Sequence, residues 1–394
     1  MKVNTDSKKI QEFLTRGVEN VYPSREEFEK ALKSGKQLKI YNGIDPTGPT
    51  LHIGHGVVLM KLRELQDLGH KVILLIGDFT GMIGDPTDKT ATRKKLTRKE
   101  VLANCKNYTK QAGKILDIRK VEIKYNSKWL GKLRAVDFLE LGSEITVQRL
   151  LERDMFEKRI KEAKPIYLHE FIYPMLQGYD SVAMSVDGEI GGNDQTFNML
   201  TGRDMMKNRG KEKFVLTTKL LVDPTGKKMG KTEGNMVTLE DSPEEMYGKV
   251  MSWPDTLMEA AFEICTRVPT DEAKNILAGD PRDAKMRLAR EIVTLYHSAK
   301  YAVKAEENFI KIFQKKEAPE EVAEVKIGNE KINILDLLVE TKLAASKGEA
   351  RRLVEQGGVK VGDQIISDIN AVAEIPAEGV LVQKGKRHFV KVKS

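Results

Sequence analysis

A strand, a tight turn and a helix follow one another directly in residues 38–68, and this succession constrains the fold more than any other stretch. Residues 38–44 are rich in β-branched and aromatic side chains, and the turn-forming pair Asp45-Pro46 follows them. The predicted helix ends at Gly69 and carries apolar residues at helical spacing, namely Val58, Leu62, Leu65 and Leu68. Such a unit is typical of folds in which strands and helices alternate.

Two histidines, His52 and His55, stand at the start of this predicted helix with a glycine between them. The unpaired N–H groups and the dipole of a helix N-terminus attract anions. One helical turn separates the two imidazoles, so both can reach the same phosphate. A single histidine at a helix start is usually only a polar cap, but the pair at this spacing favours a phosphate site.

Further apolar runs suit strands that helices cover on both faces, as in a parallel sheet. The expected strands are residues 71–78, 120–125 and 214–222, and helical patterns cover 1–36 and 129–163. We therefore expect an α/β fold, with a doubly wound, Rossmann-like parallel sheet. Ligands of such folds bind outside the carboxyl ends of the strands.

Three segments should converge on that crevice: the opening turn, residues 80–85, and the run from Gly191 to Gln195. A lysine-rich loop, residues 223–232, directly follows the last expected strand. Lysine-rich loops are usually only solvated, but its place at a strand end makes a phosphate-facing role worth weighing.

The charge and cysteine content limit the class of protein. The 394-residue chain carries a formal net charge of +8, which favours a polyanionic partner. Its two cysteines, Cys105 and Cys265, lie far apart, which argues against a disulfide framework and a zinc site. We expect no protein-bound metal. The N-terminal residues lack an apolar signal core and no window approaches a membrane span, so we expect a cytoplasmic protein without a membrane partner.

The second half of the sequence divides into three parts. Residues 240–315 show helical patterns throughout, and residues 317–330 are acidic and weakly patterned, as in a linker. Residues 331–394 combine two predicted helices with a hairpin, an α+β pattern, and hold eleven basic and eight acidic residues. We expect these domain boundaries: a catalytic domain, 1–238, with an insert at about 125–165; a helical domain, 239–316; a linker, 317–330; and an RNA-binding domain, 331–394.

Together these features resemble the class I aminoacyl-tRNA synthetases, and more closely the bacterial tyrosyl-tRNA synthetases. The family's His-Ile-Gly-His motif is present unchanged at residues 52–55. The run from Lys228 to Thr232 is similar to the second motif, Lys-Met-Ser-Lys-Ser, with Gly230 and Thr232 at the serine positions. The last 64 residues resemble a small RNA-binding domain that the family shares with a ribosomal small-subunit protein. The resemblance implies a catalytic role for His52, His55, Lys228 and Lys231.

The resemblance also implies the binding residues. Tyr173, Gln177 and Asp180 are spaced to lie on one face of a helix. The implied tyrosine-binding residues are Tyr41 and Asp180 for the phenol, Tyr173, Gln177 and Asp85 for the ammonium group, and Gln195 and Thr80. The implied ATP-binding residues are Gly43, Asp45, Pro46, Thr47, His52, Gly54, His55, Asp194 and Lys231. The implied tRNA-binding residues are Arg351 and Arg352.

The implied reaction activates L-tyrosine with ATP, with Mg²⁺ arriving on the nucleotide, to give tyrosyl-adenylate and pyrophosphate. The tyrosyl group is then transferred to the 3′ end of tRNA(Tyr). The family counterpart of residues 129–163 forms a two-fold dimer interface, which implies a homodimer. Four apolar residues there look exposed, namely Leu150, Leu151, Met155 and Phe156. Three alternatives remain open at this point: a tryptophanyl enzyme, a small nucleotidyltransferase of the same superfamily, and a non-catalytic RNA-binding protein on a synthetase scaffold.

Overall fold

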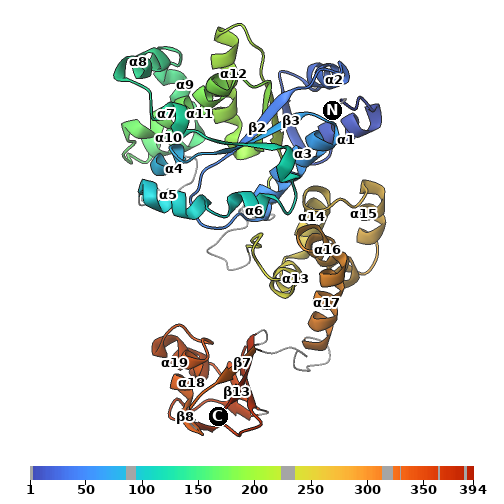
Figure 1. Ribbon diagram of the computed structural model, residues 1–394, viewed down its shortest axis with the longest axis vertical. Helices are drawn as coiled ribbons and strands as arrows, with labels where there is room; N and C mark the ends of the chain where they lie inside the picture. The colour runs from blue at the N-terminus through green and yellow to red at the C-terminus, as the bar shows by residue number, and fades with distance from the viewer. Residues whose placement is uncertain are drawn as a thin grey trace. The chain divides into compact units, whose positions relative to one another are not determined.

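The computed structural model describes residues 3–85, 95–222, 236–312, 323–328, 330–362, 364–385 and 388–394. The chain divides into two compact units, one up to Ala302 and one from Val303 onward (Figure 1). The further division expected at about residue 238 stays a prediction.

A six-stranded sheet in the order β1-β6-β5-β2-β3-β4 forms the centre of the first unit. Its strands are β1 (Val18–Tyr22), β2 (Lys39–Ile44), β3 (Lys71–Ile76), β4 (Val121–Tyr125), β5 (Gly188–Gly192) and β6 (Phe214–Thr218). β1 runs antiparallel to β6, and every other neighbouring pair is parallel. The chain continues from β2 to one side of the sheet and from β5 to the other, so the topological switch point lies between these two strands. The expected doubly wound α/β fold is confirmed.

Helices cover the sheet and reach the switch point from both sides (Figure 1). The three that position the site are α3 (Ile53–Asp67), α11 (Leu168–Met184) and α12 (Thr196–Asn208). The others up to this point are α1 (Ser7–Thr15), α2 (Arg25–Lys33), α4 (Thr80–Ile83), α5 (Arg98–Cys105), α6 (Tyr108–Ala112), α7 (Ser127–Leu130), α8 (Ala135–Ser143), α9 (Val147–Leu151) and α10 (Asp154–Lys161), with the 3-10 turns η1 (Ile118–Lys120) and η2 (Asn193–Gln195). No helix among the described residues is long and apolar enough to cross a membrane.

One helical prediction for this unit needs correction. Residues 1–36 contain strand β1 between α1 and α2, because pairing with β6 outweighs the local helical pattern. Residues 129–163 are largely helical, as predicted, and the helical residues are divided among several short helices. Ser24 caps α2, since its side chain accepts a hydrogen bond from the backbone N–H of Glu27.

The end of the first unit is helical, as expected, and continues into the second. Its elements are α13 (Pro243–Met251), η4 (Asp255–Leu257), α14 (Met258–Cys265), α15 (Thr270–Leu277), α16 (Pro281–Tyr296) and α17 (Ala299–Ile310). Ser242 caps α13 and forms a capping box with Glu245. The Arg16 guanidinium donates hydrogen bonds to the backbone oxygens of Phe262, Glu263 and Thr266, and so ties α1 to α14.

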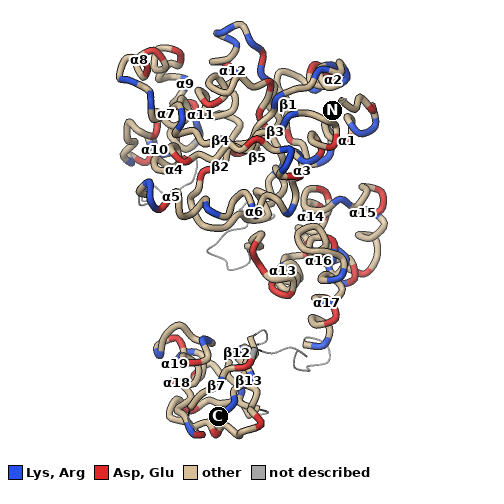
Figure 2. The backbone as a smooth tube through the Cα atoms, viewed as in Figure 1, with Lys and Arg blue, Asp and Glu red and all other residues tan. Residues whose placement is uncertain are grey.

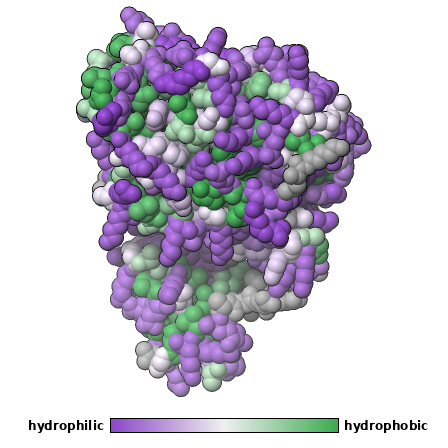
Figure 3. Space-filling model, turned by 45° about the horizontal axis from the view of Figure 1, so that its top comes forward, coloured by the Kyte–Doolittle hydropathy of each residue, from purple (hydrophilic) through white to green (hydrophobic). Residues whose placement is uncertain are grey.

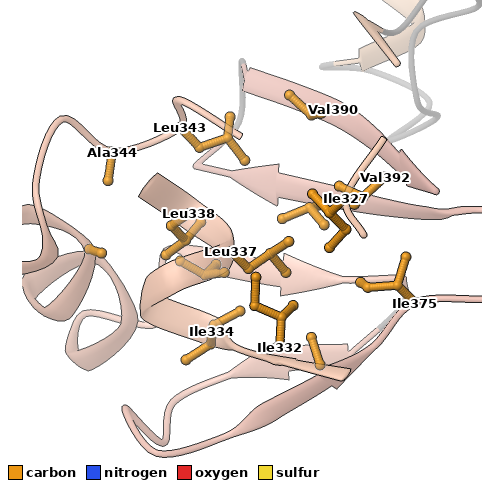
Figure 4. Packing of buried hydrophobic residues seen from close by; sticks show 14 of the residues in the cluster. Ile327, Ile332, Ile334, Leu337, Leu338, Leu343, Ala344, Ile375, Val390 and Val392 are labelled. Atoms are coloured by element: carbon orange, nitrogen blue, oxygen red, sulfur yellow. The ribbon is translucent and has the colours of Figure 1, made fainter. Parts of the chain in front are cut away.

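The second unit is a small α+β domain with two sheets. The five-stranded sheet has the order β10-β9-β12-β13-β7, and β11 pairs with β8. Its elements are β7 (Ala323–Lys326), β8 (Lys331–Asn333), α18 (Ile334–Glu340), α19 (Lys347–Glu355), β9 (Val359–Val361), β10 (Gln364–Ile366), β11 (Val372–Glu374), β12 (Val380–Lys384) and β13 (His388–Lys393). Leu337 and Leu338 of α18 face Val390 and Val392 across its buried core (Figure 4).

The predicted linker extends too far toward the C-terminus. Residues 323–326 form β7, which pairs in parallel with β13 at the edge of the five-stranded sheet. The backbone hydrogen bonds of this pairing, formed with residues more than sixty positions away, give order to a segment whose own pattern is weak. The hairpin of β9 and β10 and the helix after Ser346 lie where the sequence predicts them.

Candidate active site

A cavity of about 510 Å³ opens at the carboxyl ends of the parallel strands, at the switch point between β2 and β5. Its lining comes from segments distant in the sequence: the turn after β2, the start of α3, one face of α11 and the turn after β5. The convergence predicted from the sequence is therefore found. Parallel strands direct their following turns to one edge of the sheet, which explains why these segments meet.

His52 and His55 hold one another at the N-terminus of α3. The Nδ1 atom of His52 accepts a hydrogen bond from the backbone N–H of Gly54, and the Nδ1 atom of His55 accepts one from the backbone N–H of His52, both at 3.2 Å. The two ring centroids lie 4.0 Å apart. Because Nδ1 accepts in both rings, a neutral imidazole carries its proton on Nε2. Both residues thus present a donor edge at the helix end.

One end of the cavity is built from buried groups that suit a hydroxyl. The Tyr41 hydroxyl lies 2.9 Å from the Ser181 hydroxyl. The Asp180 carboxylate accepts hydrogen bonds from the indole Nε1 of Trp129, at 2.7 Å, and from the Nδ2 of Asn126, at 3.2 Å. Tyr41 and Asp180 are 0% and 2% exposed, so both side chains are almost completely shielded from solvent.

Burial shifts the acid–base properties of this end of the site. Burial, followed by the nearby carboxylates of Glu189 and Asp180, raises the pKa of Tyr41 well above its ordinary value. Burial also raises the pKa of Asp180 well above its ordinary value, although the donors Trp129 and Asn126 act in the opposite direction. These groups therefore favour partners that supply hydrogen bonds, rather than an apolar ring edge.

Asp45 connects the turn after β2 with two other elements. Its Oδ1 accepts a hydrogen bond from the Thr80 hydroxyl at 2.6 Å, and its Oδ2 accepts one from the Tyr173 hydroxyl at 2.9 Å. An added Cβ at Gly77 would lie 1.9 Å from Asp45 Oδ1, so only glycine leaves room for this carboxylate. Burial, then the charge of Asp45, raises the pKa of Tyr173 well above its ordinary value.

A second group of acceptors lies beside Tyr173. The Nε2 of Gln177 donates to Glu189 Oε1 at 3.2 Å, and the Nε2 of Gln195 donates to Asp85 Oδ2 at 2.7 Å. The guanidinium of Arg153, between α9 and α10, lies 3.7 Å from Asp85 Oδ1. Tyr173, Gln177 and Asp180 lie on one face of α11 and all line the cavity, as their spacing predicts.

The other residues predicted to bind ATP or tRNA do not all line the cavity. Gly43, Thr47, Gly54 and Asp194 line the cavity. Pro46 is not among its lining residues, and its carbonyl oxygen instead accepts a hydrogen bond from Asn104 at 2.9 Å. Lys228 and Lys231 lie outside the described residues. Arg351 and Arg352 are exposed on α19 in the second unit.

Sequence reasoning missed several residues that shape the site, above all Asn126, Trp129, Arg153, Ser181 and Glu189. Asn126 donates to both Thr80 and Asp180, and Trp129 reads in the sequence as the start of an apolar helical pattern. Glu189 offered a signal, because it is a charged residue directly before the apolar and glycine residues Ile190 to Gly192 of the short buried strand β5. For none of these residues does the local sequence pattern predict which side chain it contacts.

A smaller cavity of about 250 Å³ lies between α1, α3 and α14. Its buried Lys61 donates hydrogen bonds to the Phe13 carbonyl oxygen and to Glu64, both at 2.9 Å. The guanidinium of Arg16 donates its hydrogen bonds to the backbone carbonyl oxygens at the end of α14, as described above. These cations hold the three helices together. Among the described residues, no group of three or more His, Cys, Asp or Glu side chains could hold a metal ion.

Comparisons with known proteins agree with this geometry. The family model for class I tRNA synthetases (W and Y) matches residues 33–314, and the model for a tyrosine–tRNA ligase SYY-like C-terminal domain matches residues 314–392. A tyrosine–tRNA ligase of Moorella thermoacetica is 45% identical over 390 residues, covering 96% of this chain and 94% of that protein. One of Chlorobaculum tepidum is 47% identical over 368 residues, covering 92% and 91%.

Solved structures show the same fold. A C-terminally truncated mitochondrial tyrosyl-tRNA synthetase of Coccidioides posadasii has a TM-score of 0.63 and 26% identity, and the match covers 76% of this chain and 91% of that one. A tyrosyl-tRNA synthetase of Archaeoglobus fulgidus complexed with L-tyrosine has a TM-score of 0.61 at 21% identity, covering 76% and 100%. The chain belongs to the tyrosine–tRNA ligase family of the class I aminoacyl-tRNA synthetases.

Proposed function

We propose that the cavity at the switch point activates L-tyrosine with ATP, and that the chain then transfers the tyrosyl group to the 3′ end of tRNA(Tyr). Family membership supplies the ligase reaction, and the proposal assigns its steps to residues. One observation carries it: a helix N-terminus with two histidines shares a cavity with buried groups that suit a phenol. The tryptophanyl alternative is disfavoured, because an indole would leave the hydrogen-bonding capacity of Asp180 and Tyr41 unused.

We assign the two ends of the substrate to the two groups of acceptors. The phenol hydroxyl takes the place between Tyr41 and Asp180, and the ammonium group takes the place beside Tyr173, Gln177 and Asp85. Thr80 acts through Asp45, whose carboxylate it holds. Gln195 acts in the same way on Asp85. In this orientation the tyrosine carboxylate faces the N-terminus of α3, where ATP must place its α-phosphate.

Activation needs positioning and charge stabilisation. A carboxylate oxygen of tyrosine attacks the α-phosphorus, a new oxygen–phosphorus bond forms, and the bond to the leaving pyrophosphate breaks. The Nε2 donors of His52 and His55 stabilise the negative charge that grows on the phosphate oxygens. Lys228 and Lys231, on the loop outside the described residues, would bind the leaving pyrophosphate.

The nucleotide is held by backbone and small polar residues at the cavity mouth. Gly43, Thr47, Gly54 and Asp194 line this part of the cavity and are proposed to contact ATP. A contact between Pro46 and ATP stays a prediction. The carbonyl oxygen of Pro46 accepts a hydrogen bond from Asn104. Mg²⁺ would arrive with the triphosphate, because Mg²⁺ keeps several waters and binds chiefly through substrate phosphates in such sites.

We propose a homodimer, but through different side chains than the sequence indicates. Leu150 and Phe156 are buried, at 5% and 0% exposure, and therefore cannot form an interface. The exposed apolar residues in and after the insert are instead Val136, Leu139, Val147, Ile160, Tyr167 and Leu168. In Figure 3, hydrophobic residues gather at the upper left of the face shown, where Figure 1 places α8 and α9. Such contiguous apolar surface favours association, and two-fold dimers are the commonest oligomers.

We propose that the second unit binds tRNA through its basic residues, and that the protein works in the cytoplasm. Arg351 and Arg352 are exposed on α19, where Figure 2 marks basic residues, and the Arg351 side chain pairs with Glu355 one turn away on the same helix. A solvent-exposed pair of this kind is weak, so a phosphate can replace the carboxylate.

Tyrosine-dependent exchange of pyrophosphate into ATP tests the proposal. The purified protein should support exchange with L-tyrosine, much less with phenylalanine and not with tryptophan. His52→Ala and His55→Ala should each lower the exchange rate strongly while leaving tyrosine affinity nearly unchanged, because the imidazoles act mainly in the transition state. Exchange that does not depend on tyrosine, or loss of tyrosine binding in both histidine variants, would contradict these assignments.

A further inference from the structure

A buried ion pair borders the cavity at the switch point, since one of its partners, Glu189, lines that cavity. Glu189 on β5 and Lys213 just before β6 are 3% and 0% exposed, and their charged groups are in contact. The Lys213 ammonium also donates to the Met199 carbonyl oxygen at 3.0 Å. An added Cβ at Gly202 would lie 2.7 Å from the Lys213 Nζ, so glycine at this position leaves room for the ammonium.

Such a pair is not explained by stability. Removing two charges from water is expensive, and their attraction repays this only in part, so an apolar pair of similar volume usually serves a fold equally well. Burial lowers the pKa of Lys213, while the carboxylate of Glu189 acts in the opposite direction. The Lys213 ammonium donates to Glu189 Oε2, and a carboxylate can only accept hydrogen bonds.

Because the Glu189 carboxylate only accepts hydrogen bonds, it determines the orientation of the Gln177 amide. The amide has a donor end and an acceptor end, and Glu189 Oε1 receives the donor end at 3.2 Å. The carbonyl oxygen of Gln177 is therefore directed away from Glu189. Because Gln177 lines the cavity, this oxygen is the end available to a ligand, and it suits a positively charged group.

We propose that Glu189 and Lys213 are positioning residues, which hold the amide of Gln177 with its carbonyl oxygen ready for the ammonium group of the substrate. The inference rests on the proposed role of Gln177 in binding tyrosine. If an amide replaced the Glu189 carboxylate, as in Glu189→Gln, that side chain could donate a hydrogen bond, the amide of Gln177 could turn over, and the NH₂ group of Gln177 would repel the ammonium.

Three ligands separate this role from the alternatives. Tyrosine has both the ammonium group and the phenol, phenylalanine lacks the phenol hydroxyl, and 3-(4-hydroxyphenyl)propionate lacks the ammonium group. Glu189→Gln should weaken binding of tyrosine and phenylalanine about tenfold each, the loss of about one charge-assisted hydrogen bond. It should leave the affinity for 3-(4-hydroxyphenyl)propionate unchanged, as measured by equilibrium titration without ATP.

Other patterns overturn the inference. Equal weakening of all three ligands would mean a structural role for Glu189. Weakening of tyrosine and 3-(4-hydroxyphenyl)propionate, with phenylalanine unaffected, would mean that Glu189 acts through the phenol group of Tyr41 instead. Absence of tyrosine binding in the unaltered protein would instead contradict the proposed function itself.

Three further variants make the test robust. Glu189→Gln combined with Lys213→Met removes both charges and should keep the melting temperature while showing the same ammonium-selective loss. In a Gln177→Met background, Glu189→Gln should cause no further change, because its intermediary is already missing. A further loss there overturns the inference. Glu212→Gln is the matched control, an exposed carboxylate next to Lys213 whose neutralisation should leave the affinity for all three ligands unchanged.

Discussion

Replacing Asp180 by alanine should reduce the use of tyrosine far more than the use of phenylalanine. In the structure the carboxylate accepts hydrogen bonds from Trp129 and Asn126 and lines the cavity, where we assign it to the phenol hydroxyl. The variant leaves the tyrosine hydroxyl without its acceptor. A hydrogen bond to a charged group contributes about 1.5–3 kcal/mol, which corresponds to roughly a 10- to 150-fold loss in kcat/KM.

The phenylalanine reaction serves as the internal reference for this variant. Phenylalanine has no hydroxyl, and in the unaltered protein it leaves Asp180 buried without that partner. The donors Trp129 and Asn126 lose their acceptor whichever amino acid is bound, so this structural effect cancels in the ratio of the two kcat/KM values. The kcat/KM for phenylalanine should therefore fall only by this shared structural effect, and the ratio should fall by the full 10- to 150-fold.

Pyrophosphate exchange with each amino acid measures the ratio. Tyr179→Phe is the control, because it removes a hydroxyl from the adjacent position of α11, on a side that packs against Leu141 and Met205 rather than lining the cavity. It should leave both kcat/KM values unchanged. Equal losses for tyrosine and phenylalanine in Asp180→Ala would refute the assignment of this residue to the phenol.

Three further predictions concern the lysine loop, the acid sensitivity of the fold and the second unit. Lys231→Ala should lower the adenylation rate strongly with little change in tyrosine affinity, measured by single-turnover kinetics and titration; a parallel loss of affinity would make its role structural. Burial lowers the pKa of His70 to about 4, so on acidification the unfolded chain binds a proton at this residue before the folded chain does. The free energy of unfolding should therefore decrease as the pH is lowered from about 6.5 to 4, by about 2 kcal/mol between pH 7 and pH 5 in denaturant titrations. His70→Gln should remove this part of the pH dependence. A chain ending at Ile312, ahead of β7, should retain tyrosine-dependent pyrophosphate exchange but lose tRNA charging and the steep salt dependence of tRNA affinity, whereas loss of both activities would make the second unit a stability element.

The sequence by itself determined the features that depend on near neighbours. The strand, turn and helix of residues 38–68 follow from local periodicity and turn chemistry, and they place His52 and His55 at a helix N-terminus without any tertiary information. The helical spacing of Tyr173, Gln177 and Asp180 likewise put three polar groups on one face of α11.

Only the tertiary structure decided the partners of these groups. β1 is a strand because β6, about 200 residues away, pairs with it. Asn126 and Glu189 are site residues because the sheet brings β4 and β5 to the same edge as β2, and Arg153 reaches Asp85 from the insert. The pairing of Glu189 with Lys213 is of the same kind. Hydrogen bonds and ion pairs depend on the distance between two side chains in space, and spacing along the chain predicts that distance only within one helix, strand or turn.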